Sequence, residues 1–325
     1  MLRQRPGMDV QPLPDHLVRG AHRHGALRTA GITRREIDGP LWRRTTHGLY
    51  AFGPSPPATA LQRVQEAAAA LPPGGVLGGW AAAFLWGAVD LDGEDGAGRP
   101  HPVPLALPPE AQVRRGSGFR TWRSRLAAAD VGVVDGMPVT SPVRTAFDLA
   151  RFQPLEDGMV AVDALLRCVD LRTLERYVRA HPRWKGVPRA RAVLELADPA
   201  ARSCPESRFR YVWVVEAGLP RPRVNIRVVT ADAVLLGLPD LLDEDSGLVG
   251  EYDGGHHREL DAHTADNVRE EAMEQAGLVV VRATSVDLRR AERPALVQRL
   301  RAGLDRARLV PVECRGWRVA ARPAA

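Results

Sequence analysis

The sequence predicts an α/β protein of several compact units, whose C-terminal part has its elements in the order αβββαβ. Three strand-like runs between residues 223 and 253 follow a helical segment and are separated by short turns. A second helical segment then leads to a strand that ends near residue 284. Tight turns pair neighbouring strands antiparallel and a crossover helix permits parallel pairing, so we expect a mixed sheet.

The length of the chain suggests more than one domain. Its 325 residues correspond to two or three compact units, and 45% hydrophobic residues can supply their cores. Pro/Gly-rich stretches between residues 53 and 109 interrupt the first half. We expect a winged-helix DNA-binding module at 1–55, a middle α+β region at 56–200, the αβββαβ domain at 201–310 and a loose tail at 311–325.

The N-terminal module is predicted to hold three helices followed by a β-hairpin. Thr33 and Glu36 form a capping-box pattern that opens a helix over residues 34–42, and residues 42–52 are typical of a hairpin with Gly48 at its turn. This is the outline of a winged helix. Arg34 and Arg35 would lie in the first turn of the recognition helix, and Arg43 and Arg44 at the base of the wing. From these positions the four arginines would reach DNA phosphates. A solvated basic face on a structural module is the alternative for these residues.

The middle region contains no reactive constellation. Trp80, Trp86 and Phe147 lie in segments with helical apolar spacing, so we expect them in the core rather than in contact with a ligand.

The net charge of +6 and the pI near 9.8 suit a polyanionic partner such as DNA. Residues 1–50 and 101–203 each carry +5, whereas residues 204–325 sum to −1. The C-terminal segment is therefore the least basic of the large ones, as expected if its acids surround a cation.

Other classes of protein are disfavoured by composition. Cys168, Cys204 and Cys314 lie far apart without a CxxC motif, which indicates reduced thiols rather than disulfides or structural zinc. The chain has no apolar run of the roughly 20 residues that span a bilayer, and its first residues lack the apolar core of a signal peptide. We expect a cytoplasmic protein with no membrane partner.

Three carboxylates are predicted to share one face of the C-terminal sheet. A symmetric hairpin around Asp245 and Ser246 places Asp240 opposite Glu251, and Asp253, two residues further along the strand, shares that face. Crowded carboxylates repel one another, and a divalent cation relieves that repulsion. A lone Asp before a turn is usually a turn former, but Asp240 is embedded in an apolar run, where an unpaired carboxylate is costly.

Two further residues are candidates for the same site. Glu206 follows Ser203 in a capping-box pattern, so it either holds the start of the helix or completes the metal site. His257 follows the acidic strand by a short glycine loop, where it could accept a proton from water or donate one to a leaving oxygen. An exposed histidine without a role is the alternative.

Two segments of the first half resemble a known family. The segment RTAGITRREIDGPLWRRTTHGLYAF resembles the N-terminal winged helix of AbiEi-type antitoxins from abortive-infection systems, and VVDGMPVTSPVRTAFDLAR is similar to the middle region of actinobacterial members. This resemblance implies DNA binding, often by autoregulating repressors.

The C-terminal domain resembles another group over about residues 200–290. The blocks PESRFRYVWVVEAGLPRPRVNI, GLPDLL, EYDGGHHREL, DNVREEAMEQAG and LVVVRAT are similar to a bacterial family of the PD-(D/E)XK nuclease superfamily that is related to very-short-patch-repair endonucleases. The resemblance implies a restriction-endonuclease-like core. It makes Glu206 the acid of the first helix, Asp240 the central metal ligand, Glu251 the second acid and His257 the motif histidine.

The same resemblance matches Asp266 and Arg269 to a D-x-x-R motif in the following helix, and Arg282 to an arginine of the next strand. Asp253 occupies the position where many members of the superfamily have a lysine. The resembled family often has E-x-D-G-x-x-H, which would leave water activation to His257 or to a second metal ion.

These patterns together predict a metal-dependent DNA endonuclease that acts in DNA repair or phage defence. Asp240 and Glu251 would hold Mg²⁺ or Mn²⁺, and DNA is the expected partner; a homodimer is left open. The alternative is a DNA-binding transcriptional regulator or antitoxin-like protein whose nuclease fold is catalytically silent. No Gly-rich nucleotide motif supports a small-molecule enzyme.

Overall fold

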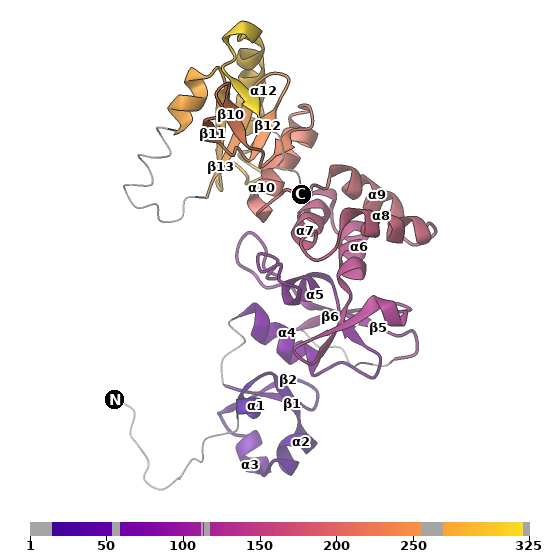
Figure 1. Cartoon of the computed structure of the whole chain (residues 1–325). Helices are drawn as coiled ribbons and strands as arrows, with labels where there is room; N and C mark the ends of the chain where they lie inside the picture. The colour runs from indigo at the N-terminus through magenta and orange to yellow at the C-terminus, as the bar shows by residue number, and fades with distance from the viewer. Residues whose placement is uncertain (1–14, 54–58, 112, 114–117, 255–268, 321–325) are drawn as a thin grey trace, which may run out of the picture. The chain divides into compact units, whose positions relative to one another are not determined.

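The computed structural model describes residues 15–53, 59–111, 113, 118–254 and 269–320. The chain divides into two compact units, residues 1–148 and 149–325, and the division falls within helix α6 (Pro142–Phe152). Figure 1 shows both units and their helices and strands. The predicted middle region, 56–200, therefore contributes residues to both units. No helix of the described residues combines the length and apolar character needed to cross a bilayer.

The N-terminal part of the first unit is a small antiparallel sheet with short helices. Its elements are α1 (Asp15–Val18), β1 (Ala21–Arg23), α2 (His24–Thr29), α3 (Arg34–Ile37), β2 (Trp42–Thr46) and β3 (Leu49–Phe52). The strand order is β1-β3-β2, and Leu17, Leu27, Ile37 and Trp42 form the core. The predicted hairpin is present, with Gly48 at φ +72° in its turn.

Two details of this part differ from the prediction. Strand β1, which was not expected, lies between α1 and α2 and pairs with β3. Helix α3 ends at Ile37 rather than at Trp42. Pro40 disfavours a helical conformation for Gly39, which explains the early end.

The rest of the first unit is a five-stranded mixed sheet with the order β6-β5-β4-β8-β7. Its elements are α4 (Ala60–Ala68), β4 (Val76–Leu77), α5 (Gly79–Leu85), β5 (Val103–Leu107), β6 (Phe119–Arg123), a 3₁₀ turn (Ala128–Asp130), β7 (Val131–Val134), β8 (Met137–Thr140) and the start of α6. Trp80 and Phe147 are buried, which confirms their predicted place in the core. Trp86 is half-buried, and its indole N–H donates to the carbonyl of Thr140 at 2.8 Å.

The second unit begins with helices and continues as an α/β domain. The helices are α7 (Leu155–Leu165), α8 (Leu171–Ala180), α9 (Val187–Leu196) and α10 (Cys204–Tyr211), which continues into a π-helical segment, Val212–Glu216. The strands are β9 (Arg223–Val224), β10 (Val228–Thr230), β11 (Leu235–Gly237), β12 (Leu241–Asp243), β13 (Leu248–Asp253) and β14 (Val279–Thr284). Helical residues 269–275 precede β14. Helix α12 (Arg293–Leu309), a 3₁₀ turn (Val312–Cys314) and β15 (Trp317–Val319) complete the unit.

Two sheets form where one mixed sheet was predicted. Each of the first two predicted strands is divided, so that β9 and β12 join β13 and β14 in one sheet while β10 and β11 pair in another. Asn225, with φ +49°, separates β9 from β10, and Pro239 stands between β11 and β12. The parallel pairing of β13 with β14 agrees with the predicted crossover.

The predicted loose tail is wrong for residues 317–319. They form β15, which pairs antiparallel with β10, and Trp317 packs against the core beneath this second sheet. Trp317 and Val319 alternate with Arg318 along the strand, a short period-2 pattern that identifies a half-buried strand.

Candidate active site

Glu251 lies in β13, and Asp240 directly precedes β12, the adjacent strand of the four-stranded sheet. Leu241 pairs with Gly250, which is the register predicted from the hairpin, and Asp240 directly precedes this pair. The Asp240 carboxylate lies against β13, since its Oδ2 accepts the backbone N–H of Tyr252 at 2.7 Å. The backbone of Asp240 in turn accepts the N–H of Asn225 at 3.1 Å. These bonds hold the Asp240 side chain beside the strand that carries Glu251.

The surroundings of Asp240 oppose its negative charge. Burial and the charge of Glu206 together raise the pKa of Asp240 to about 6, against the lowering effects of the Tyr252 hydrogen bond and of the charges of Arg202 and Arg269. Burial and a second carboxylate both destabilise the charged form of a carboxyl group. A cation bound next to it stabilises that charged form.

Glu206 holds the start of α10, which is one of the two roles considered for it from the sequence, while its role in a metal site stays a prediction. Its carboxylate accepts hydrogen bonds from Ser203 Oγ at 2.9 Å and from the backbone N–H of Arg202 at 3.1 Å, at the start of α10. The same carboxylate accepts the side-chain amide of Asn225 at 2.9 Å. The carboxylate therefore caps the helix and also contributes to the electrostatic environment of Asp240.

Asn225 and Arg202 were not identified from the sequence. Asn225 joins the two acids, because its backbone binds Asp240 and its side chain binds Glu206. One feature of the sequence could have identified Asn225: an asparagine interrupts a strand-like run, and asparagine tolerates the left-handed backbone conformation that it has there, with φ +49°.

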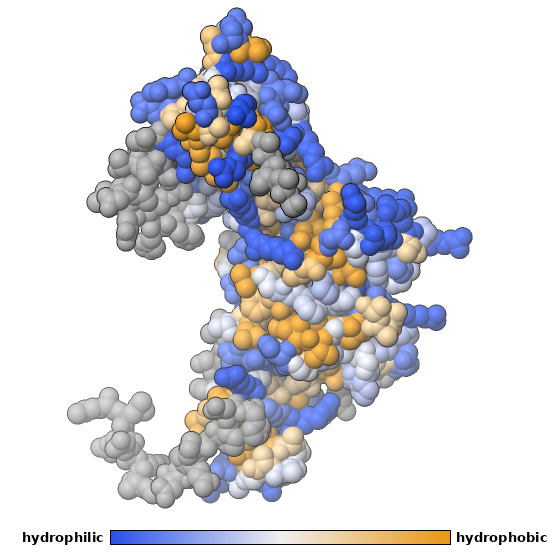
Figure 2. Space-filling view, in the orientation of Figure 1, coloured by the Kyte–Doolittle hydropathy of each residue, from blue (hydrophilic) through white to orange (hydrophobic). Residues whose placement is uncertain are grey.

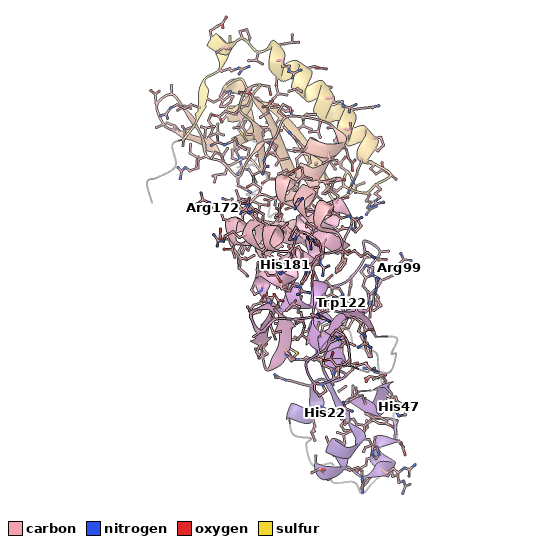
Figure 3. All side chains as sticks on the ribbon, turned by 90° about the vertical axis from the view of Figure 1, so that its right-hand side faces the viewer. His22, His47, Arg99, Trp122, Arg172 and His181 are labelled. Carbon is pink, nitrogen blue, oxygen red and sulfur yellow. The ribbon has the colours of Figure 1, made fainter. Side chains whose placement is uncertain are left out.

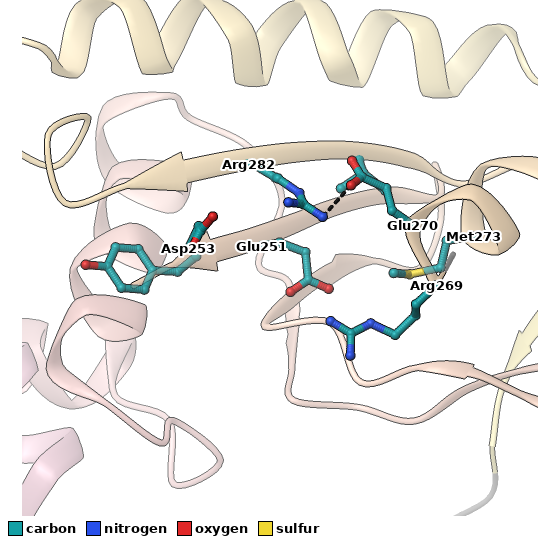
Figure 4. A pocket seen from close by; sticks show the side chains of 8 residues that line it. Glu251, Asp253, Arg269, Glu270, Met273 and Arg282 are labelled. Atoms are coloured by element: carbon teal, nitrogen blue, oxygen red, sulfur yellow. Dashed lines mark ion pairs between the residues drawn. The ribbon is translucent and has the colours of Figure 1, made fainter. Parts of the chain in front are cut away.

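A small pocket lies beside Glu251 (Figure 4). Its volume of about 20 Å³ is room for roughly one water molecule. In Figure 4, Glu251 is directed toward Arg269, while Arg282 and Glu270 form an ion pair on the other side of the pocket. The remaining lining residues are Tyr252, Asp253, Met273 and Val280. Arg282 is the register partner of Glu251 across the parallel strands.

The structure brings the predicted acids into two adjoining groups. Glu206 and Asp240 interact electrostatically, and Glu251 and Asp253 line the small pocket. Within the described part of the chain, no three His, Cys, Asp or Glu side chains are grouped so that they alone could hold a metal ion. His257 and Asp266 lie outside the described residues.

The four predicted DNA-binding arginines have different surroundings. The predicted capping box of Thr33 and Glu36 is confirmed, and Arg34 and Arg35 lie exposed in the short helix that it opens. Arg44 is also exposed and lies 2.9 Å from His47 Nδ1. Arg43 instead forms a 2.5 Å ion pair with the buried Glu66 of α4.

Comparisons with known proteins found similarity to a family model and to a solved structure. Residues 81–196 match the family model of the AbiEi antitoxin C-terminal domain. The solved structure of the RV2827C protein from Mycobacterium tuberculosis aligns with a TM-score of 0.35 and 22% identity, over 54% of this chain and 71% of that one. No curated protein matches the chain. The chain is thus similar to the AbiEi antitoxin C-terminal domain in residues 81–196, which include residues 133–151, one of the two segments that predicted this resemblance. The other segment, residues 28–52, lies outside the match, so its resemblance stays a prediction.

Proposed function

We propose that the C-terminal domain hydrolyses DNA phosphodiester bonds with the help of Mg²⁺ or Mn²⁺ held by Asp240 and Glu251. The observation that carries the proposal is the half-buried Asp240 carboxylate, which stands beside Glu251's strand and within the field of Glu206. Such a set of oxygens is the donor type that these hard cations prefer.

The number of carboxylates is compatible with such an ion. Mg²⁺ usually keeps several waters and is bound by one or two protein carboxylates together with substrate phosphates. Asp240 and Glu251 would supply those carboxylates, with Glu206 and Asp253 as neighbouring acids. When bound, the ion lowers the pKa of a water molecule and neutralises charge on the phosphate.

The residues of the chain have separate roles in this proposal. The Tyr252 N–H orients the Asp240 carboxylate, and Arg269 and Arg282 beside Glu251 provide donors suited to phosphate oxygens. His257 remains the predicted proton carrier. Asp253, which stands at the position of a lysine in many nucleases of the superfamily, provides no cation for the reaction.

The second candidate function is a DNA-binding regulator of the antitoxin type, with a silent C-terminal domain. The similarity of residues 81–196 to the AbiEi antitoxin C-terminal domain favours it and suggests a role in a toxin–antitoxin or defence system. Arg34, Arg35 and Arg44 are exposed and could contact phosphates in either case.

A plasmid-nicking assay distinguishes the two functions. We expect the full chain to nick supercoiled DNA with Mg²⁺ or Mn²⁺ and Asp240→Asn to lose this activity. Asp232→Asn is the matched control, because it removes an exposed carboxylate from a turn of the same domain. Nicking that survives in Asp240→Asn contradicts the proposed site. Binding to the protein's own promoter without strand breaks under either ion supports the regulator.

A further inference from the structure

Helices α8 and α9, their connection and the turn before α8 carry a dense group of basic side chains. Between residues 167 and 191 there are eight basic residues and two acids, Asp170 and Glu175. All eight basic residues are exposed: Arg167, Arg172, Arg176, Arg179, Arg183, Lys185, Arg189 and Arg191. Figure 2 shows strongly hydrophilic side chains over these helices, and Figure 3 labels Arg172 on this surface. We call these eight residues the α8–α9 basic surface.

Helical spacing aligns part of this surface in a row. Arg172, Arg176 and Arg179 are separated by four and three residues, so they lie on one face of α8. Leu174 and Val178, which are buried, lie on the opposite face and attach the helix to the core of the unit. Because the buried face of α8 is the opposite one, Arg172, Arg176 and Arg179 face solvent, and their charges lie along one line.

The connection between the helices is packed against neighbouring side chains and the end of α6. The ring of His181 lies between those of Tyr177 and Trp184, at centroid distances of 4.3 and 4.5 Å, tilted toward the first and edge-on to the second. Arg151 Nη1 donates to the carbonyl of Lys185 at 3.1 Å. Gly186 has φ +85°, and a Cβ there would lie 2.4 Å from the carbonyl oxygen of Arg151. Arg183 and Lys185 are thus presented by a well-packed loop.

The two acids of this segment neutralise little of its charge. The carboxylate of Asp170 caps α8 by accepting the backbone N–H groups of Arg172 at 2.9 Å and Thr173 at 3.2 Å. Glu175 lies 3.8 Å from Arg179 in an exposed pair, a distance at which such a pair contributes little. Among the described residues, Arg179 alone of the eight has an ion-pair partner, and Arg167, Arg176 and Arg189 make side-chain hydrogen bonds. The other four side chains have neither kind of partner there: Arg172, Arg183, Lys185 and Arg191.

We infer that the α8–α9 basic surface binds the phosphate backbone of duplex DNA. A row of guanidinium groups on a rigid helix suits a regular line of phosphates, and pre-organised side chains lose less entropy on binding. The inference rests on the proposed DNA-binding function but not on hydrolysis. It assigns phosphate contacts to the second unit, in addition to those predicted for Arg34, Arg35 and Arg44.

The salt dependence of binding tests this inference. The triple variant Arg172→Gln/Arg183→Gln/Arg191→Gln removes three charges whose side chains have no ion pair with a described residue. Each lost phosphate contact lowers the slope of log K against log salt by about 0.9, so we expect a decrease of about 2–3. Binding of the full chain to a random duplex of about 30 base pairs is measured without divalent ions between about 50 and 200 mM salt.

A matched variant controls for the loss of net charge. Arg289→Gln/Arg306→Gln/Arg308→Gln also removes three exposed arginines from the second unit, and we expect its slope to equal that of the wild type. Equal slopes for both triple variants overturn the inference, as does a decrease that appears with single-stranded RNA and not with the duplex. The inference is supported if the slope of log K against log salt decreases in Arg172→Gln/Arg183→Gln/Arg191→Gln while this variant still nicks plasmid DNA at low salt. Loss of nicking in Asp240→Asn bears only on the acidic site.

Discussion

Asp240 combines an orienting hydrogen bond with an environment that penalises its charge. The N–H of Tyr252 fixes the carboxylate, while burial and Glu206 raise its pKa to about 6. The folded protein therefore binds the Asp240 proton more tightly than the unfolded chain does, in which the pKa is about 3.9. By linkage, ionised Asp240 lowers the stability of the fold progressively as the pH rises from about 4 to about 6.

Substitution of Asp240 by Asn should relieve this penalty. We expect Asp240→Asn to be more stable than the wild type above about pH 6, by about 1–3 kcal/mol, and to match it near pH 4. Urea unfolding across this pH range measures the difference, with Asp232→Asn as the control. Addition of Mg²⁺ above about pH 6 should stabilise the wild type and not Asp240→Asn, because a ligand stabilises the state that binds it. An equal effect on both proteins would exclude Asp240 as a ligand.

Arg43 and Arg44 are neighbours in sequence with different roles. Arg43 compensates the buried Glu66, whose pKa is raised by burial in spite of this partner, whereas Arg44 is exposed. We expect Arg43→Gln to reduce the free energy of unfolding by about 1.5–3 kcal/mol, since it removes a charged hydrogen-bond partner. Arg44→Gln should leave stability unchanged and weaken DNA binding. Thermal unfolding and a gel-shift assay separate these effects; equal stability of the two variants would contradict the structural role of Arg43.

At the scale of elements, the hairpin that carries the acids could be predicted and the strand boundaries around it could not. The symmetric turn at Asp245 and Ser246 determined the pairing of Leu241 with Gly250, because register follows from the turn. The division between β9 and β10 depends on Asn225, which the apolar pattern around it concealed. The link from Asn225 to Glu206 is a tertiary contact and has no local signal in the sequence.

Strand β13 is positioned by close contact with α10. A Cβ added to Gly250 would lie 2.8 Å from Phe209 Cε1 and 3.1 Å from Trp213 Cζ3, so only glycine allows this approach next to Glu251. We expect Gly250→Ala to lower the free energy of unfolding by about 1–3 kcal/mol through overpacking. Gly254→Ala is the control, because among the described residues its Cβ would meet only Tyr252 Cε1, at 3.8 Å. Denaturant unfolding measures both variants, and a neutral Gly250→Ala would show that α10 can move away.

At the scale of the whole molecule, the last three helices of the predicted middle region, α7, α8 and α9, belong to the same unit as the acidic site. Asp163 of α7 accepts Ser207 Oγ at 2.6 Å and also pairs with the buried Arg210 of α10. Glu156 of α7 pairs with Arg293 of α12 at 2.6 Å. The match to the AbiEi antitoxin C-terminal domain ends at residue 196, before α10, so these ion pairs connect the matched segment to the α/β domain.

This arrangement predicts how the chain can be divided. A fragment of residues 149–325 retains the partners of Arg210 and Arg293, whereas a fragment of residues 201–325 leaves two buried guanidinium groups without Asp163 and Glu156. Breaking one buried pair by removing a partner costs about 3–5 kcal/mol, a large share of the stability of a domain. We therefore expect the longer fragment to unfold cooperatively and the shorter one to be unfolded or aggregated, as judged by circular dichroism during thermal unfolding. Asp163→Ala in the longer fragment should reproduce part of the loss. If residues 201–325 unfold cooperatively at the same temperature as residues 149–325, α7 is dispensable and the acidic site belongs to an independent domain.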